Sequence, residues 1–180
     1  MSGTELERQQ DIVTARMRLR RLRPRDAALI ALYSSDRRVG WATSRVPHPY
    51  PPGAAEALIE RATAPGATEL YWALDTGDDD ENGLIGVIAL RPNGEGAGQI
   101  GYWVAPAFWN TGYAGEAVEG LIGWAAEHGW RELTAEVFQD NPASARVLTR
   151  AGFDYEGEGE TYSLARDGMV PSFLYRRRLG

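Results

Sequence analysis

Small residues interrupt the chain just before a stretch with helical periodicity, in the run Asn110-Thr-Gly-Tyr-Ala-Gly115. Gly112, Ala114 and Gly115 leave room for phosphate oxygens to approach the backbone closely. The free N–H groups at the start of the following helix point to one place, and the helix dipole adds positive potential there. This run is therefore predicted to bind a phosphate-bearing ligand, and such a site needs no lysine or arginine.

The spacing of residues in this run excludes two other kinds of phosphate-binding motif. The long glycine-rich phosphate loop is excluded because its Lys-Ser/Thr ending is missing. A dinucleotide fingerprint is excluded by the spacing and by the lack of an acidic residue after a following parallel strand. A glycine-rich turn with no ligand is the remaining alternative.

A second polar cluster, Asp140-Asn-Pro-Ala-Ser144, opens another predicted helix. Asn141 is a favoured N-cap residue, Pro142 suits the first helical position, and Gly152 is the expected stop. Ser144 then lies in the first turn, where its hydroxyl bonds either to nearby backbone or to a ligand.

Composition bounds the class of protein. The chain has 180 residues, 43% of them hydrophobic, which fits one domain with a continuous core. A formal charge of −6 argues against nonspecific nucleic-acid binding and suits either solubility or attraction of a cationic substrate. Cysteine is absent and only His48 and His128 occur, which excludes disulfides, thiolate chemistry and a histidine-rich metal site.

The chain shows no signal-peptide pattern and no apolar run of about 20 residues, so a soluble, cytoplasmic protein without membrane contact is expected. Residues 1–13 are polar and irregular and are predicted to form a flexible tail. Residues 14–180 are predicted to form a single domain.

Hydrophobic periodicity predicts the elements that position these motifs. Strands are expected at residues 16–22, 69–74, 84–90, 99–104, 132–138, 153–162 and 172–178. Helices are expected after Pro24, at 54–64, at 113–128 and after Asp140, and residues 34–53 are expected to be a loop. The order predicts an α/β (α+β) fold whose mostly antiparallel sheet of about seven strands is flanked by about four helices, with one strand–helix–strand crossover.

These motifs together resemble the GNAT family of acyl-CoA N-acyltransferases. The anchors in the family's order are Ile100-Gly-Tyr-Trp-Val104, Pro106, Phe108-Trp109, Gly112-Tyr-Ala114, Glu116-Ala117, Asp140-Asn-Pro-Ala-Ser144, Arg146-Val-Leu148 and Gly152-Phe153. Three N-terminal motifs resemble the subgroup that acetylates the N-terminal amines of ribosomal proteins: Arg18-Leu-Arg20, Arg25-Asp26 and Pro49-Tyr-Pro51. The likeness covers about residues 14–178.

The resemblance implies acetyl-CoA as the acyl donor. Backbone groups of Val104 and Ala105 would meet the pantetheine arm, in a slot opened by a bulge after Tyr102. The pyrophosphate would be wrapped by Asn110, Thr111, Gly112, Tyr113, Ala114 and Gly115. Arg146 and Arg150 would meet the adenosine phosphates or are solvated helix positions. Thr111 replaces the basic residue common before Gly112, so phosphate affinity would depend more on backbone groups.

Acetyl transfer needs a neutral amine and a stabilised thiolate. Many family members use a helix tyrosine as the acid, but Leu148 occupies that position here, and the subgroup's alternative is Ser144. Asn141 would cap the helix and hydrogen-bond the cofactor. The subgroup often carries a glutamate where Gln99 stands, and a neutral amide takes no proton. Glu136 is the preferred substitute base, with Glu116 or a water chain as alternatives.

The acceptor pocket implied by the resemblance lies under the N-terminal helices. Its wall is expected to include Trp41, His48, Tyr50 and Tyr102, unless these residues pack in the core. The predicted activity is N-acetylation of a primary amine, either a protein N-terminus or a small molecule, by direct attack in a ternary complex. The rival is a noncatalytic acyl-CoA-binding or regulatory module, favoured by Gln99 and Leu148. A homodimer is left open.

Overall fold

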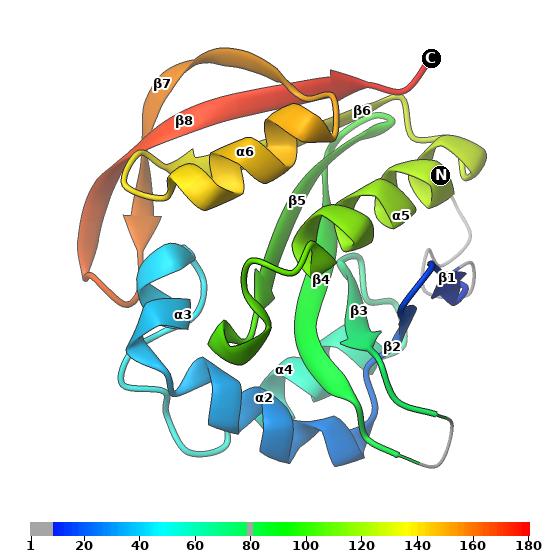
Figure 1. Cartoon of the computed structure of the whole chain (residues 1–180), viewed down its shortest axis with the longest axis vertical. Helices are drawn as coiled ribbons and strands as arrows, with labels where there is room; N and C mark the ends of the chain where they lie inside the picture. The colour runs from blue at the N-terminus through cyan, green and yellow to red at the C-terminus, as the bar shows by residue number, and fades with distance from the viewer. Residues whose placement is uncertain (1–8, 79–80) are drawn as a thin grey trace.

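The computed structural model describes residues 9–78 and 81–180, which share one twisted sheet (Figure 1). Its strands are β1 (Ile12–Val13), β2 (Arg18–Arg21), β3 (Leu70–Asp75), β4 (Leu84–Gly94), β5 (Ala97–Val104), β6 (Glu132–Phe138), β7 (Asp154–Ser163) and β8 (Gly168–Arg178). They lie in the order β1-β2-β3-β4-β5-β6-β8-β7. Only the β5–β6 pair is parallel among these strands, which confirms the predicted fold class with one strand more than expected.

Helices cover both faces of the sheet. The described α-helices are α2 (Ala27–Ser34), α3 (Arg37–Ala42), α4 (Ala54–Thr63), α5 (Tyr113–Glu127) and α6 (Pro142–Arg150). Short 3₁₀ turns occupy Pro24–Asp26 and Pro106–Phe108. One core lies between the sheet and α5, and a smaller core lies under α2 and α4.

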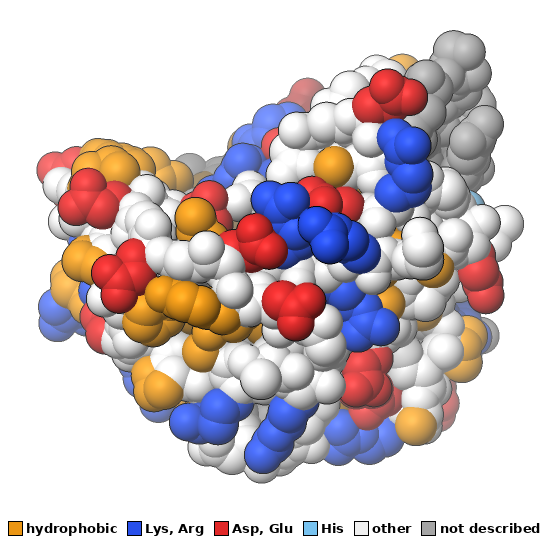
Figure 2. Space-filling model, turned by 90° about the horizontal axis from the view of Figure 1, so that it is seen from above, with side chains coloured by type: hydrophobic (Ala, Val, Ile, Leu, Met, Phe, Trp, Pro, Cys, Tyr) orange, Lys and Arg blue, Asp and Glu red, His pale blue; other side chains and the backbone are white. Residues whose placement is uncertain are grey.

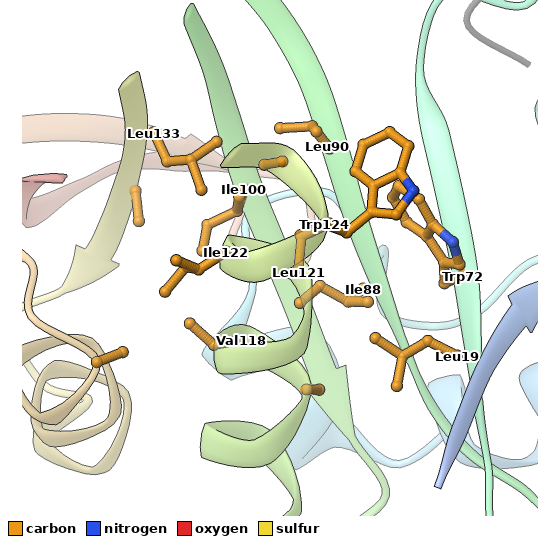
Figure 3. Close-up of a cluster of buried hydrophobic side chains, with 14 of the residues drawn as sticks. Leu19, Trp72, Ile88, Leu90, Ile100, Val118, Leu121, Ile122, Trp124 and Leu133 are labelled. Atoms are coloured by element: carbon orange, nitrogen blue, oxygen red, sulfur yellow. The ribbon is translucent and has the colours of Figure 1, made fainter. Parts of the chain in front are cut away.

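Alternation along β3 shows how one strand serves both cores. Trp72 and Leu74 pack toward α5, where Trp72 meets Trp124 edge to face with ring centroids 5.1 Å apart (Figure 3). Tyr71 and Ala73 point to the α2 and α4 side. Because successive side chains leave a strand on opposite faces, this continuous apolar strand is buried on both sides.

The surface of the molecule seen from above carries charged side chains of both signs (Figure 2). Acidic and basic side chains are interspersed on the side seen from above, with apolar side chains between them (Figure 2). Exposed apolar residues of the described chain include Tyr155, Tyr162, Leu164 and Met169, which lie on or between β7 and β8.

The sheet begins before residue 14, the boundary expected for the domain. Ile12 pairs with Leu19 and is buried, and Gln9 Nε2 donates a hydrogen bond to the Tyr71 carbonyl at 2.7 Å. Residues 9–13 are therefore held against the sheet rather than forming part of a flexible tail. Residues 1–8 of the predicted tail lie outside the described residues.

The segment 34–53 was expected to be a loop, and this prediction is wrong for α3. Asp36 caps this helix by accepting a hydrogen bond from the Arg38 amide at 2.9 Å. Six residues that include Gly40 are too short to show a helical repeat in the sequence. The helix matters because its last residue, Ala42, reaches the start of α6.

Strands β5 and β6 separate soon after they pair. Their register covers Ala97 to Gln99 against Glu132 to Thr134. Strand β5 meanwhile stays paired with β4 up to Gly86 and Val104, with its register shift at Pro92/Gly94. The expected bulge after Tyr102 is therefore wrong, and the slot opens because the short parallel pairing ends.

Candidate active site

A tyrosine and a serine meet in the slot between the separated strands. The Tyr102 hydroxyl on β5 lies 2.7 Å from Ser144 Oγ in the first turn of α6. Burial raises the pKa of Tyr102 to about 12, although the bond to Ser144 acts in the opposite direction. The phenol is therefore neutral near pH 7 and can donate a hydrogen bond.

Asn141 fixes the start of α6, as the sequence predicts for an N-cap. Its Oδ1 accepts a hydrogen bond from the Ser144 amide at 3.2 Å. Its Nδ2 reaches the Ala42 carbonyl at 3.5 Å, a long contact that links α6 to α3. Leu148, one turn further along α6, is fully buried and offers no acid at that position.

A cavity of about 920 Å³ surrounds this pair. Its wall includes Gln99, Tyr102, Glu136, Asn141, Ser144 and Leu148. It has the size of a small-molecule site and reaches both faces of the sheet through the slot. The structure therefore brings together five of the residues considered for catalysis and for the acceptor wall, with Leu148 beside them.

The two candidate bases occupy different places. Glu136 is exposed on the cavity wall, and its Oε2 accepts a hydrogen bond from Thr161 Oγ1 at 2.6 Å. Glu116 lies outside this wall and accepts hydrogen bonds from Thr14 and Arg16. Burial alone would raise the pKa of Glu116, but these bonds and the Arg16 charge outweigh it, so its pKa is lowered. Glu116 thus anchors the N-terminal segment.

Three of the four residues expected in the acceptor wall are placed elsewhere. Trp41 packs against the guanidinium groups of Arg37 and Arg166, whose central carbons lie 4.2 and 5.2 Å from its ring centre. His48 packs near Gly40 of α3, and Tyr50 packs against the core under α2 and α4. None of the three lines the cavity. Of these four residues only Tyr102 lies in the cavity wall, although the segment 42–46 directly after Trp41 also lines it.

The glycine-rich run forms an open turn at the start of α5. Gly112 is the N-cap with φ of 86°, and Asn110 also has a positive φ of 60°. Thr111 closes the turn by donating its hydroxyl proton to the Phe108 carbonyl. A Cβ at Gly115 would meet nothing within 4 Å, so the surface before this helix is open to a ligand.

Arg16 supplies a cation to this turn, and it is not among the residues predicted for the site. Its Nη1 donates to the Thr111 carbonyl at 2.8 Å, and its guanidinium carbon lies 4.2 Å from the centre of the Tyr113 ring. The side chain is still 43% exposed and can meet a ligand. The two partners are 95 residues apart in sequence, so no local motif could have revealed the contact.

The end of β5 has specific backbone groups to offer. The Ala105 amide donates to the Ile85 carbonyl at 2.8 Å, and its carbonyl accepts from Phe108, so both groups are occupied. Because successive N–H groups of a strand point in opposite directions, the Val104 amide faces the slot. The Val104 carbonyl accepts a hydrogen bond from Trp109 Nε1 at 2.6 Å. Trp109 thereby braces the strand end.

The predicted adenosine-phosphate contacts lie on α6. Arg146 and Arg150 are exposed there. The Arg146 side chain takes part in no hydrogen bond or ion pair within residues 9–78 and 81–180. In the same residues, no group of three or more His, Asp or Glu side chains is arranged to hold a metal ion. No described helix has the length and apolar character needed to cross a bilayer.

Solved structures share this fold over nearly the whole chain. An acetyltransferase (GNAT family) from Bacillus anthracis superposes with a TM-score of 0.80 at 20% identity, covering 94% of this chain and 99% of the other. RimL, a ribosomal L7/L12 alpha-N-protein acetyltransferase in complex with coenzyme A, gives 0.81 at 16% identity, covering 94% and 98%. MccE, a microcin C7 self-immunity acetyltransferase in complex with acetyl-CoA and AMP, gives 0.77 at 16%, covering 91% and 93%.

Sequence relatives point to the same family. The uncharacterised N-acetyltransferase YoaA of Bacillus subtilis (strain 168) is 34% identical over 90 residues, which is 49% of this chain and 50% of YoaA. The matched stretch thus spans only about half of that relative. The uncharacterised N-acetyltransferase p20 of Bacillus licheniformis is 23% identical over 92% of this chain and 94% of its own length. The family model of the acetyltransferase (GNAT) domain matches residues 16–154, and the chain therefore belongs to the GNAT acetyltransferase family.

Proposed function

We propose that this chain is an N-acetyltransferase that moves an acetyl group from acetyl-CoA to a primary amine by direct attack in a ternary complex. The observation that carries the proposal is the contact between Tyr102 and Ser144 in the slot between β5 and β6. It supplies two hydroxyl groups where a departing thiolate would need hydrogen bonds.

The cofactor half of the proposal is supported by the residues around the slot. The turn at Gly112 offers backbone N–H groups and a helix N-terminus, and Arg16 adds a positive charge. The Val104 amide would donate to the thioester oxygen as negative charge develops there. Among the structures with this fold, that of MccE contains acetyl-CoA and that of RimL contains coenzyme A.

The acidities of the thiol and of the Tyr102 phenol indicate that Tyr102 donates a hydrogen bond and does not transfer its proton. The amine nitrogen attacks the thioester carbon, the carbon–sulfur bond breaks, and a thiolate departs. A thiol has a pKa of about 8.5. The Tyr102 phenol, whose pKa is raised to about 12, is a weaker acid and keeps its proton. Tyr102 and Ser144 therefore stabilise the thiolate by donating hydrogen bonds, and its final proton comes from solvent or the amine.

The attacking amine must lose a proton to become neutral and another after attack. Glu136 is a carboxylate on the cavity wall beside the slot and can accept one, directly or through water. A protein N-terminal amine, with a pKa of about 7.7–8.0, is partly neutral already, whereas a lysine amine near 10.4 needs more help. Both a protein N-terminus and a small amine remain candidate acceptors.

A noncatalytic acyl-CoA-binding module is the rival function. Gln99 in the cavity wall and buried Leu148 favour it, because neither takes or gives a proton. Thiol release from acetyl-CoA, measured over a panel of amines and peptides, separates the two. The chain contains no lysine, so self-acetylation of side-chain amines does not obscure the assay. Cofactor binding without thiol release across the panel would overturn the enzyme proposal.

A further inference from the structure

The cavity wall on the α4 side is basic, in contrast to the chain as a whole. Arg45, Arg61 and Arg91 line it, and the carboxylates in the lining are Glu69 and Glu136. Three arginines against two glutamates give the lining a formal charge of +1, whereas the whole chain carries −6. Positive charge is therefore concentrated where an acceptor would bind.

Arg91 is built into this wall. Its side chain is only 14% exposed, and its Nε is buried without a hydrogen-bond partner among the described residues. Its guanidinium lies across β5 at Gly101, where a Cβ would come within 2.9 Å of Nη1. Glycine at position 101 thus leaves space for a guanidinium one residue from Tyr102.

Glu69 balances only part of this charge. Its carboxylate accepts hydrogen bonds from Tyr71 at 2.6 Å and Arg45 at 3.2 Å, and it lies 3.7 Å from Arg91 Nε. Burial opposes ionisation of Glu69, but the Tyr71 bond and the charges of Arg91 and Arg45 outweigh it, so its pKa is lowered. The carboxylate stays charged and orients Arg91, while Arg61 forms no ion pair within the described chain.

Because side chains alternate along β5, the residue that would contact the departing thiolate and the residues that would contact the acceptor face opposite sides of the sheet. Tyr102 faces α6, while Arg91, Gln99 and Gly101 face the opposite side, toward α4. An acceptor whose amine enters the slot beside Tyr102 would therefore place the rest of its body against Arg91. Because Arg91 lines the cavity, its guanidinium can donate charge-assisted hydrogen bonds to an oxyanion that enters there.

Resting on the proposed acetyl transfer, we infer that the acceptor is an amine that also carries a carboxylate or phosphate group, which Arg91 binds with help from Arg61. The test uses matched acceptors that differ in the anionic group. Amino acids are compared with their carboxamides, and phosphoethanolamine is compared with ethanolamine. The charged member of at least one pair is acetylated with the higher kcat/KM, and the pair that shows it identifies the anion as carboxylate or phosphate.

Variants then locate the recognition. Arg91→Gln lowers kcat/KM for the charged acceptor by about 10- to 100-fold and leaves its neutral partner within about twofold. Arg91→Lys retains part of the preference, because it keeps the charge without the planar fork. The control is Arg178→Gln, on the exposed end of β8 outside the cavity wall, which leaves kcat/KM unchanged for both acceptors.

Two outcomes overturn the inference: a wild-type enzyme that prefers the neutral member of both pairs, or a preference unchanged by Arg91→Gln. Calorimetric binding of coenzyme A shows whether each variant is folded. If Arg91→Gln fails that check, the exposed Arg61→Gln variant and the wild-type preference decide. Failure of the proposed function gives a different result, because no thiol is then released from acetyl-CoA with any acceptor.

Discussion

The Tyr102 hydroxyl lies 2.7 Å from Ser144 Oγ, and these two residues come from different elements on either side of the slot. Ser144 is held by α6, whose N-cap is Asn141, and Tyr102 is held by the β4–β5 pairing. The contact therefore depends on the sheet and the helix being placed together. It supplies a phenol at the site, where the buried Leu148 of α6 offers no acid.

Removing either hydroxyl should slow acetyl transfer. Tyr102→Phe and Ser144→Ala are each expected to lower kcat by about 10- to 100-fold, because a hydrogen bond to a charged group contributes ~1.5–3 kcal/mol. The KM for acetyl-CoA should change little, since the thiolate forms only during the reaction. Steady-state thiol release measures both constants. Tyr155→Phe, an exposed tyrosine on β7, is the control, and unchanged turnover in both site variants would remove the pair from the mechanism.

The pH dependence should report the acceptor and leave Tyr102 silent. A phenol with its pKa raised to about 12 is protonated below that value, so it does not lose its proton between about pH 6 and 10. The rate should rise with pH as the acceptor amine becomes neutral and then level off. The profile of kcat/KM with two acceptors of different amine pKa checks this. A falling limb below about pH 10 that disappears in Tyr102→Phe would contradict the assignment.

Arg16 should strengthen cofactor binding. Arg16→Gln removes the charge beside Thr111 and Gly112. We expect the dissociation constant for acetyl-CoA to become about 10-fold larger and to depend less on ionic strength. Calorimetric titration at two ionic strengths measures both effects. Because Arg16 also holds Glu116, the variant Glu116→Gln separates loss of this anchor from loss of the charge. Equal affinity in wild type and Arg16→Gln would show that backbone groups alone bind the pyrophosphate.

A buried charge cluster should govern stability and not activity. Arg20 is 2% exposed and bonds to Asp26 through two nitrogens at 2.9 Å and to Asp75 at 2.5 Å. Asp26→Ala leaves a buried guanidinium partly unpaired, so the free energy of unfolding should fall by ~3–5 kcal/mol. Urea denaturation followed by circular dichroism measures the loss. Glu95→Ala is the matched control, since Glu95 and Arg131 form an exposed pair at 4.0 Å, and a similar loss in both variants would contradict this account.

Local elements of the fold follow from the amino-acid sequence. Strand β6 runs from Glu132 to Phe138 and α5 starts at Tyr113, as apolar periodicity and the glycine-rich turn predict. Asn141 caps α6 because an N-cap bond spans only three residues, to the Ser144 amide. Such features follow from neighbouring residues, so a linear pattern is sufficient to place them.

Contacts between distant segments depend on how the elements pack. Arg16 reaches Thr111, Tyr102 meets Ser144, and Arg91 lies over Gly101 only because the sheet order and strand register place them there. A shift of one residue in register would turn Tyr102 to the other face. The surroundings of Trp41, His48 and Tyr50 depend on the same tertiary placement, since an aromatic residue carries no local sign of what it will pack against. Contacts between distant segments depend on packing the whole chain, and periodicity within one segment does not encode them.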